Sequence, residues 1–209
     1  MKTLWLLTAR EQLARAREIL QAADLVRAAK WPETALRLSL LSGLPEQAAE
    51  SPADLVIQCW SEESVALPPA LGQALAGRFD VTGLEVDERV RKDISGWSEA
   101  GEQPGVSLLA FCASPIGQTR CETLRHWTEH VRLAVTIHHG TERYIQNVIC
   151  GESPNSPWFG IAELHFPDAE GIATYLFRSE ADVAIIQADV ADFVVESPTM
   201  HVTEFVVRA

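Results

Sequence analysis

The first half of the chain alternates between two hydrophobic periods, and each change of period marks the boundary of an expected element. Thr3 to Thr8 form a short apolar run typical of a buried strand, whereas residues 10–30 have the three- and four-residue apolar spacing of an amphipathic helix. Trp31-Pro32 ends that helix, because the residue before a proline disfavours helical geometry. The rest of this half predicts two strands, a helix and a final strand, at residues 35–41, 53–60, 69–77 and 79–86.

The same order of elements recurs in the second half of the chain. Strands are expected at residues 106–112, 141–150, 159–166 and 201–207, with one helix over 120–139 and helical sequence from residue 168 onward. Thr141 lies 106 residues after Ala35, and Phe166 lies 106 residues after Trp60, so the two hairpins keep a constant offset. We therefore predict two repeats, a degenerate one over 1–95 and a second over 106–209, joined by a polar, glycine-rich linker over 96–105.

Two such repeats predict an α+β fold. Each repeat has the order β-α-β-β-α-β of a ferredoxin-like unit, which places both of its helices on one face of its sheet and leaves the other face bare. Two units can cover each other's bare faces. The sequence therefore predicts two ferredoxin-like repeats that close an eight-stranded α/β barrel within one chain.

Composition and charge narrow the classes of partner. The 209 residues are 47% apolar, which is enough for a large core, and 17 basic against 29 acidic residues give a net charge of −12. That charge repels phosphate backbones and anionic lipid, so neither nucleic acid nor a membrane is an expected partner. The cysteines (Cys59, Cys112, Cys121 and Cys150) have no metal-site spacing, and reduced thiols in a cytoplasmic protein are the expectation.

The helix over 120–139 carries the candidate chemistry. Thr119 and Glu122 form a capping box at its start. One apolar stripe follows, formed by Leu124, Trp127, Val131, Ala134, Val135 and His138. At 100° per residue, His130 lies about 85° from the middle of this stripe and can line a cavity, whereas His126 lies about 125° away and is expected to face water. His138 and His139 are expected to act as cations at the negative end of the helix dipole.

Other motifs give weaker indications. Residues 126–130 spell HxxEH, a zinc-peptidase signature, but the expected orientation of His126 and the lack of an obvious third ligand argue against a metal. Dinucleotide, P-loop and GxSxG motifs are absent from the sequence. Glu163 and His165 share one face of an apolar strand whose burial the pattern leaves open, and an exposed sheet edge is the simpler interpretation for Glu163.

Four segments of the second half resemble a known family. The segments LRHWTEHVRLA, TERYIQN, FGIAELHF and DVADFVVES, in this order, are similar to the EthD (ether degradation) family of dimeric α/β-barrel proteins. The Trp and His of the family's helix match Trp127 and His130, and the Tyr and Gln-Asn of its next strand match Tyr144, Gln146 and Asn147. The first half lacks the Trp-x-x-His pair, so the resemblance implies at most one working pocket per chain.

The resemblance implies a pocket between sheet and helices for a small hydrophobic or aromatic molecule. Members of the family are linked to ether degradation beside a cytochrome monooxygenase, and relatives act as decarboxylases or dehydratases. His130 is then the expected acid or base, and Tyr144 the hydrogen-bond donor. The expected substrate contacts are Trp127, Val131, Asn147 and His165. This chemistry requires no cofactor or metal, and the resemblance leaves a homodimer open.

Three other interpretations compete with this one. The protein could be a non-catalytic accessory or binding protein of a degradation pathway, or a haem- or metal-binding barrel that uses His130 or His165. Plain core packing is the simplest role for Trp127 and Tyr144, since large aromatic side chains chiefly fill cores.

Overall fold

The computed structural model describes residues 1–11, 15–32, 34–42, 51–151 and 156–208. Residues 12–14, which belong to the helix expected over 10–30, lie outside the described residues. The first half of the chain has the expected order of elements, although only the strand over residues 35–41 has both ends at the expected residues. They are β1 (Lys2–Ala9), α1 (Arg15–Ala28), β2 (Ala35–Leu41), β3 (Leu55–Trp60), α3 (Pro69–Leu75) and β4 (Phe79–Asp93).

The second half repeats this order with one difference. Its elements are β5 (Gly101–Glu102), β6 (Val106–Ala113), α4 (Arg120–Ile137), β7 (Arg143–Ile149), β8 (Trp158–Phe166), α5 (Ala169–Tyr175), α6 (Glu180–Ala191) and β9 (Thr199–Arg208). The helical sequence after residue 168 forms two helices. The second of them has its own N-cap, because the side chain of Ser179 accepts a hydrogen bond from the backbone N–H of Asp182.

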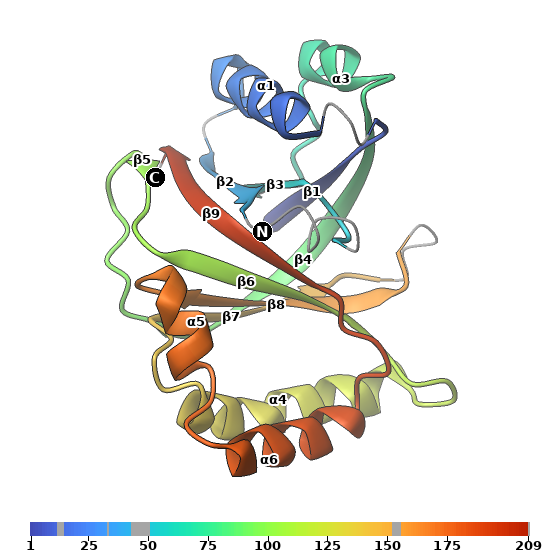
Figure 1. Ribbon diagram of the computed structural model, residues 1–209. Coiled ribbons are helices and arrows are strands. Elements are labelled where there is room, and N and C mark those ends of the chain that lie inside the picture. The colour runs from blue at the N-terminus through green and yellow to red at the C-terminus, as the bar shows by residue number, and fades with distance from the viewer. Residues whose placement is uncertain (12–14, 33, 43–50, 152–155, 209) are drawn as a thin grey trace.

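The strands close into one barrel, which confirms the predicted fold class. Their order is β2-β3-β1-β4-β7-β8-β6-β9, and β9 pairs with β2 to complete the ring of eight. The short β5 lies outside this ring order and pairs with Phe205 and Val206 of β9. Within this order each half has the strand sequence of a ferredoxin-like unit, and neighbouring strands are antiparallel. Figure 1 shows the barrel between two pairs of helices.

Two long strands join the halves. β4 pairs with β1 up to Val86 and then with β7 from Val86 to Asp93. The part of β4 beyond its expected end at Val86 is polar, so the sequence pattern does not indicate a strand there. Backbone pairing with β7 keeps this part extended. β9 likewise pairs with β6 and then with β2. Because β4 and β9 serve both halves, the boundaries of the repeats and of the 96–105 linker stay a prediction.

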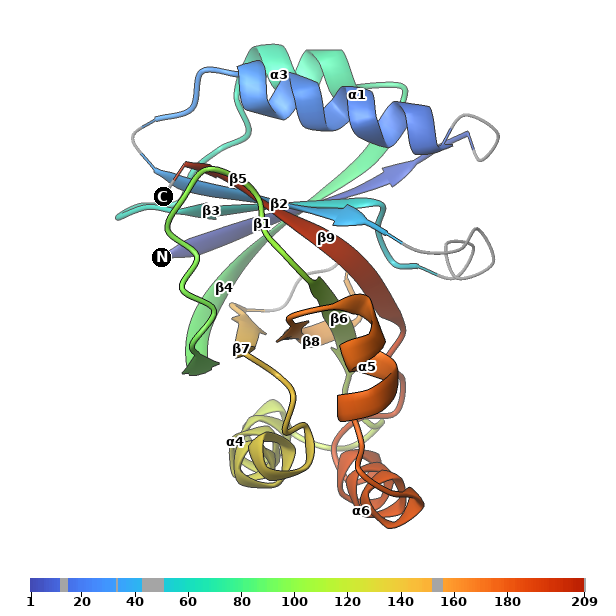
Figure 2. The same ribbon diagram turned by 60° about the vertical axis from the view of Figure 1, so that its left-hand side comes forward.

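The helices cover opposite sides of the barrel. Helices α1 and α3 lie over the strands of the first half, and α4 and α6 lie over those of the second half (Figure 2). The first helical layer rests on a dense apolar cluster that includes Trp5, Leu38 and Ile57. In the described part of the chain, no helix is long and apolar enough to cross a membrane.

The barrel interior is divided into an apolar part and a charged part. Leu4, Leu84, Phe111 and Val202 belong to the apolar cluster. Beyond them lies what we call the interior charged cluster, which consists of Lys2, Arg37, Arg143, Glu163 and Glu204, with no member more than 9% exposed. A barrel of this size is filled by side chains, and here a large share of the filling is ionic.

Glu163 is the centre of the interior charged cluster. Arg37 Nη1 and Arg143 Nε each donate to its Oε1 atom at 3.1 Å, and Lys2 Nζ lies 3.7 Å from its Oε2 atom. Burial favours the protonated form, but the three cations outweigh it and lower the pKa of Glu163 to about 2. The interpretation of Glu163 as a residue at an exposed sheet edge is therefore wrong, since its side chain is fully buried and paired.

Glu204 supplies a pH-dependent contribution to stability. Burial and the nearby charge of Glu163 raise the pKa of Glu204 to about 7, and Ser39 Oγ donates to its carboxylate at 2.8 Å. Since the unfolded chain ionises this carboxyl near its ordinary value of 4.5, Glu204 lowers the free energy of unfolding as the pH rises from about 4.5 to about 7.

We expect Glu204→Gln to gain stability relative to the natural protein over this pH range, by about 2–3 kcal/mol. The glutamine keeps an acceptor for Ser39 and removes the buried charge. Denaturant unfolding at pH 5 and pH 8 measures the difference, and Glu196→Gln, at an exposed position, is the control that should show no such gain. If Glu204→Gln and Glu196→Gln changed the free energy of unfolding equally at both pH values, Glu204 would not be the source of the pH-dependent loss of stability.

Candidate functional site

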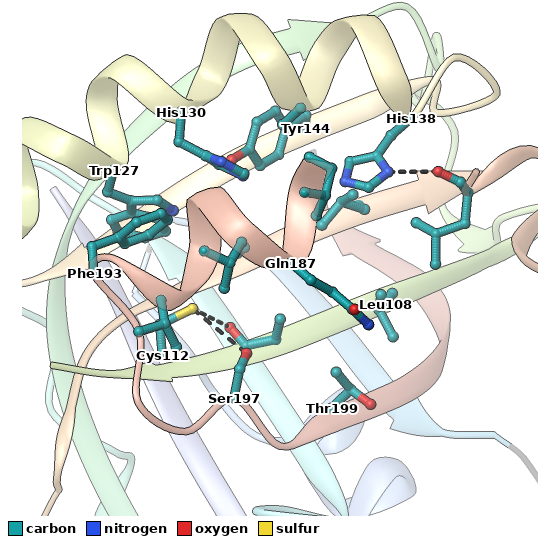
Figure 3. A pocket seen from close by; sticks show the side chains of 18 of the residues that line it. Leu108, Cys112, Trp127, His130, His138, Tyr144, Gln187, Phe193, Ser197 and Thr199 are labelled. Atoms are coloured by element: carbon teal, nitrogen blue, oxygen red, sulfur yellow. Dashed lines mark hydrogen bonds between the residues drawn. The ribbon is translucent and has the colours of Figure 1, made fainter. Parts of the chain in front are cut away.

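A cavity of about 450 Å³ lies between the second helical layer and the sheet. Its floor comes from β6, β7 and β8, and its walls come from α4 and α6 (Figure 3). Three small side chains leave the space open, namely Ala110, Ala134 and Ala162. Among the described residues that line it there is no Lys, Arg, Asp or Glu, so the cavity suits an uncharged and largely apolar molecule.

Helix α4 is rotated relative to the predicted stripe. Its buried residues are Thr123, Trp127, His130, Ala134 and Ile137, whereas Leu124, Val131 and Val135 are only partly buried. His130 therefore lies in the middle of the buried face, not at its border. The predicted stripe was displaced from the buried face because hydrophobic periodicity counts apolar positions only, and two of the buried residues, Thr123 and His130, are polar. The capping box of Thr119 and Glu122 at the start of the helix is confirmed.

Trp127 forms one end of the cavity and lies flat against β8. A Cβ atom at Gly160 would come within 2.4 Å of the indole ring, so this position must lack a side chain for the ring to reach the strand. The ring of Phe159 meets the indole edge-on, with centroids 5.1 Å apart. Trp127 is 2% exposed, and it combines core packing with a place in the cavity wall.

His130 is held by a carboxylate from α6. Its Nδ1 atom lies 2.6 Å from Oδ2 of Asp189. The carboxylate can only accept, so Nδ1 carries the proton and Nε2 is the unprotonated nitrogen. Burial lowers the pKa of His130 below its ordinary 6.5 in spite of the opposing effect of Asp189. The side chain points into the cavity as a neutral base (Figure 3).

Asp189 stays ionised in this arrangement. Partial burial would raise its pKa, but the hydrogen bonds from His130 and His126 lower it below the ordinary value. The His130–Asp189 pair thus has the geometry in which a carboxylate orients an imidazole and stabilises the cation that forms when the ring takes a proton. Asp189 was not among the predicted site residues, although it is the first residue of the DVADFVVES segment.

His126 does not face water as expected. Its Nε2 atom lies 3.3 Å from Oδ1 of Asp189, and its ring lies against Phe193 with centroids 4.9 Å apart. Asp189 occupies the space between His126 and His130, so both histidines of the HxxEH signature bind the same carboxylate. Among the residues that the structure describes, no group of three or more His, Cys, Asp or Glu side chains is placed to hold a metal ion.

Tyr144 projects from β7 into the cavity and is 3% exposed. Gln146 Nε2 donates to the Tyr144 hydroxyl at 3.4 Å, which leaves the hydroxyl proton free to be donated to a ligand. The amide of Gln146 is fixed in turn, because it donates to the carbonyl of Trp127 at 2.8 Å and accepts from Arg91 Nε at 3.0 Å. Burial raises the pKa of Tyr144, so the hydroxyl stays protonated.

The remaining polar groups of the cavity were not predicted. His138 was expected to be a cation near the helix end, but it is 8% exposed, lines the cavity, and has its pKa lowered by burial. Across the cavity lie Ser197 and Cys112, and burial raises the pKa of the Cys112 thiol to about 11. Gln187 and Thr199 are exposed and mark the side on which the cavity meets solvent.

Three of the expected substrate contacts lie elsewhere. Val131 packs at the margin of the apolar cluster under α4 and does not line the cavity. Asn147 is buried on the barrel side of β7, where its side chain helps to lower the pKa of Glu163. His165 also faces the barrel, with Nδ1 3.1 Å from Ser107 Oγ and its ring 4.5 Å from that of Trp97. The interpretation of these three residues as ligand contacts is therefore corrected, because alternation along β7 and β8 places Asn147 and His165 on the opposite sheet face.

Comparison with known structures supports the architecture. A candidate monooxygenase from Lactobacillus acidophilus NCFM superposes with a TM-score of 0.53 at 9% identity, covering 97% of this chain and 92% of the other. A candidate monooxygenase from Fusobacterium nucleatum subsp. nucleatum ATCC 25586 gives 0.55 at 7% identity, with 99% and 92% covered. An anthrone oxidase-like protein gives 0.54 at 13% identity, again with 99% and 92% covered.

These likenesses establish the fold alone. The chain shares its barrel architecture with these three proteins over nearly its whole length. No protein-family model matches the sequence, and no curated protein matches it either. Any more specific function must therefore be argued from the cavity itself.

Proposed function

We propose that the protein binds a small hydrophobic or aromatic molecule in the α4–α6 cavity and moves a proton on it by acid–base chemistry that needs no cofactor. One observation carries this proposal. His130 presents an unprotonated Nε2 atom to an uncharged cavity while Asp189 holds its other nitrogen at 2.6 Å. A neutral imidazole with a fixed tautomer in an apolar site is suited to act as a general base.

The lining supplies the other parts of such a reaction. His130 Nε2 would take a proton from an acidic C–H or O–H bond of the ligand, and the resulting imidazolium would be stabilised by Asp189. The Tyr144 hydroxyl would donate a hydrogen bond to the oxygen on which negative charge develops. Trp127 would lie against an aromatic ring. Enolisation, dehydration and decarboxylation all begin with, or end in, a transfer of this kind.

Two further points support the proposal. Three of the five residues matched in the EthD resemblance, Trp127, His130 and Tyr144, line the cavity, and they come from two different elements. The structural neighbours include an anthrone oxidase-like protein, whose name contains an aromatic ketone, and two candidate monooxygenases. An EthD-like role for this chain, as a monomer or a homodimer, is consistent with both points.

The experiment is proton exchange at carbon. Aryl ketones with acidic C–H bonds, such as tetralones and anthrone, are incubated with the protein in heavy water, and the loss of the C–H signal is followed by proton NMR. We expect the natural protein to accelerate exchange over buffer. Ala162→Phe fills the cavity from its floor and is expected to abolish the acceleration, whereas the same substitution at the exposed Ala100 is expected to leave it intact.

Other outcomes distinguish the alternatives. Ligand binding without exchange in any member of the panel would favour the non-catalytic binding protein, which the apolar lining also suits. A Soret shift on addition of haemin, lost in His130→Ala, would favour the haem alternative. Neither binding nor exchange in the natural protein would end the proposal.

A further inference from the structure

The cavity contains a second neutral imidazole that the proposed reaction does not use. His138 caps the C-terminal end of α4, and its Nδ1 atom lies 2.7 Å from the carbonyl oxygen of Leu176. A carbonyl oxygen only accepts, so Nδ1 carries the proton and Nε2 is a hydrogen-bond acceptor. In the described part of the chain no group donates to this Nε2 atom, and the imidazole points into the cavity (Figure 3).

The surroundings of His138 leave its acceptor without a natural partner. Leu164, Leu176, Phe177 and Ala134 line the same part of the cavity and are apolar, and the ring of Phe177 meets the imidazole edge-on with centroids 5.4 Å apart. Within the described residues this acceptor has no protein donor, so a donor on a molecule in the cavity can take that place. Holding α4 to the segment after α5 requires only the Nδ1 hydrogen bond, so it does not account for the free nitrogen.

The positions of His130 and His138 along α4 indicate how long a ligand must be to contact both side chains. His130 and His138 are eight residues apart, which corresponds to roughly 12 Å along a helix axis. Figure 3 shows His138 at the end of the cavity away from Trp127 and Phe193. The two imidazoles therefore face different parts of one elongated space.

We infer that His138 is the specificity-determining anchor for the far end of the ligand. The preferred ligand is an elongated, uncharged molecule with an O–H or N–H donor at the end remote from the proton that His130 removes. This inference deepens the proposed function and rests on it, since it assumes that the cavity holds the substrate. It assigns to His138 recognition of the ligand and not the transfer of the reacting proton.

A pair of rigid phenols tests the anchor by binding alone. The probes are a biphenyl with a hydroxyl at each para end and the same biphenyl with only one hydroxyl, and their dissociation constants are measured by calorimetry. A symmetric diol gains a factor of two from statistics. We expect the natural protein to prefer the diol by about fivefold to tenfold beyond that factor, as one added hydrogen bond gives.

Two variants locate the preference. In His138→Phe the dissociation constant of the mono-ol divided by that of the diol is expected to fall to the statistical factor of two. In His139→Phe the preference for the diol is expected to persist, because the neighbouring His139 does not line the cavity and bonds to the carbonyl of Ile137. A second measurement needs no variant: nitrogen NMR of the natural protein at saturation should show an upfield shift of His138 Nε2 with the diol that is at least as large as the shift with the mono-ol, whose single hydroxyl can point to either end of the cavity.

The outcomes separate this inference from the proposed function. A ratio near two in the natural protein, a ratio unchanged in His138→Phe, or no binding of either phenol would overturn the anchor. None of these results bears on proton exchange with aryl ketones, which tests the proposed function by itself. Conversely, the protein could prefer the diol through His138 and yet catalyse no proton exchange. That result would support His138 as the anchor of a protein that binds its ligand without catalysis.

Discussion

Glu163→Gln is expected to lower the free energy of unfolding by about 3–5 kcal/mol, measured by denaturant unfolding at neutral pH. The substitution preserves shape and removes one charge from the interior charged cluster. Arg37 and Arg143 would then face a neutral amide that cannot replace the carboxylate they share at 3.1 Å, and Lys2 would lose its nearest buried anion. The cost arises from losing the buried carboxylate that the three cations share, although Lys2 keeps Glu88 at 2.8 Å and Arg143 keeps Asp93 at 2.7 Å.

The pH dependence identifies the origin of this loss. The pKa of Glu163 is lowered to about 2 from an ordinary 4.5, so its contribution is fully present above pH 4.5 and is lost as the pH falls toward 2. The difference in stability between the natural protein and Glu163→Gln should therefore shrink over that interval. A loss that stays constant down to pH 2 would indicate a packing defect instead.

Glu129→Gln is the matched control, because it breaks an ion pair of similar length on the surface. Arg125 Nη1 lies 3.0 Å from Oε1 of Glu129, and these two side chains are 64% and 60% exposed. Solvent screens such a pair, and we expect a change below about 0.5 kcal/mol. If Glu163→Gln lowers the free energy of unfolding no more than Glu129→Gln does, the interior charged cluster stabilises the barrel no more than one surface ion pair would.

The buried position of Glu163 shows where sequence reasoning stops. Alternation along β8 correctly groups Glu163 with His165 and Ile161, but alternation does not say which face of a sheet becomes the interior. That is decided by closure of the barrel through β4–β7 and β9–β2, which brings Lys2, Arg37 and Glu163 together from distant parts of the chain. The fold itself was predictable, because hydrophobic periods and turn residues determine the order of elements, and that order determines the strand order.

The candidate site was predictable only in its local part. Trp127, His130 and Tyr144 could be found because two short segments in a known order carry them. Asp189 lies 59 residues from His130 and approaches it only because α6 packs beside α4, a contact that no local pattern encodes. His138 was misread for a related reason: its burial depends on the segment after α5, whose Leu176 carbonyl fixes its ring.

His130→Ala is expected to slow proton exchange by about 10²–10⁴-fold, the usual contribution of a general base. Asp189→Asn should also slow it, because an amide does not stabilise the imidazolium and can impose the wrong tautomer on His130. Dissociation constants for the phenol probes should change little in Asp189→Asn, since Asp189 does not line the cavity. The rate is followed by the same loss of C–H signal in heavy water.

The pH profile distinguishes a positioning role of Asp189 from a structural one. Burial lowers the pKa of His130 below its ordinary 6.5, so the decline of the rate at low pH should be centred below pH 6.5. Asp189 raises the pKa of His130 against the effect of burial, so its removal should move this decline to still lower pH while the plateau rate falls. A merely destabilised protein would lose activity without such a shift.

His126→Ala supplies the control for this pair. His126 binds the other oxygen of Asp189 at 3.3 Å but does not line the cavity, so its removal should slow exchange less than about tenfold. Full exchange in His130→Ala would contradict the role of His130 as base, whatever the variants of Asp189 and His126 do. Equal losses in His126→Ala and His130→Ala would indicate that the two rings act only by holding α4 against α6, because of these two rings His130 alone directs a free nitrogen into the cavity.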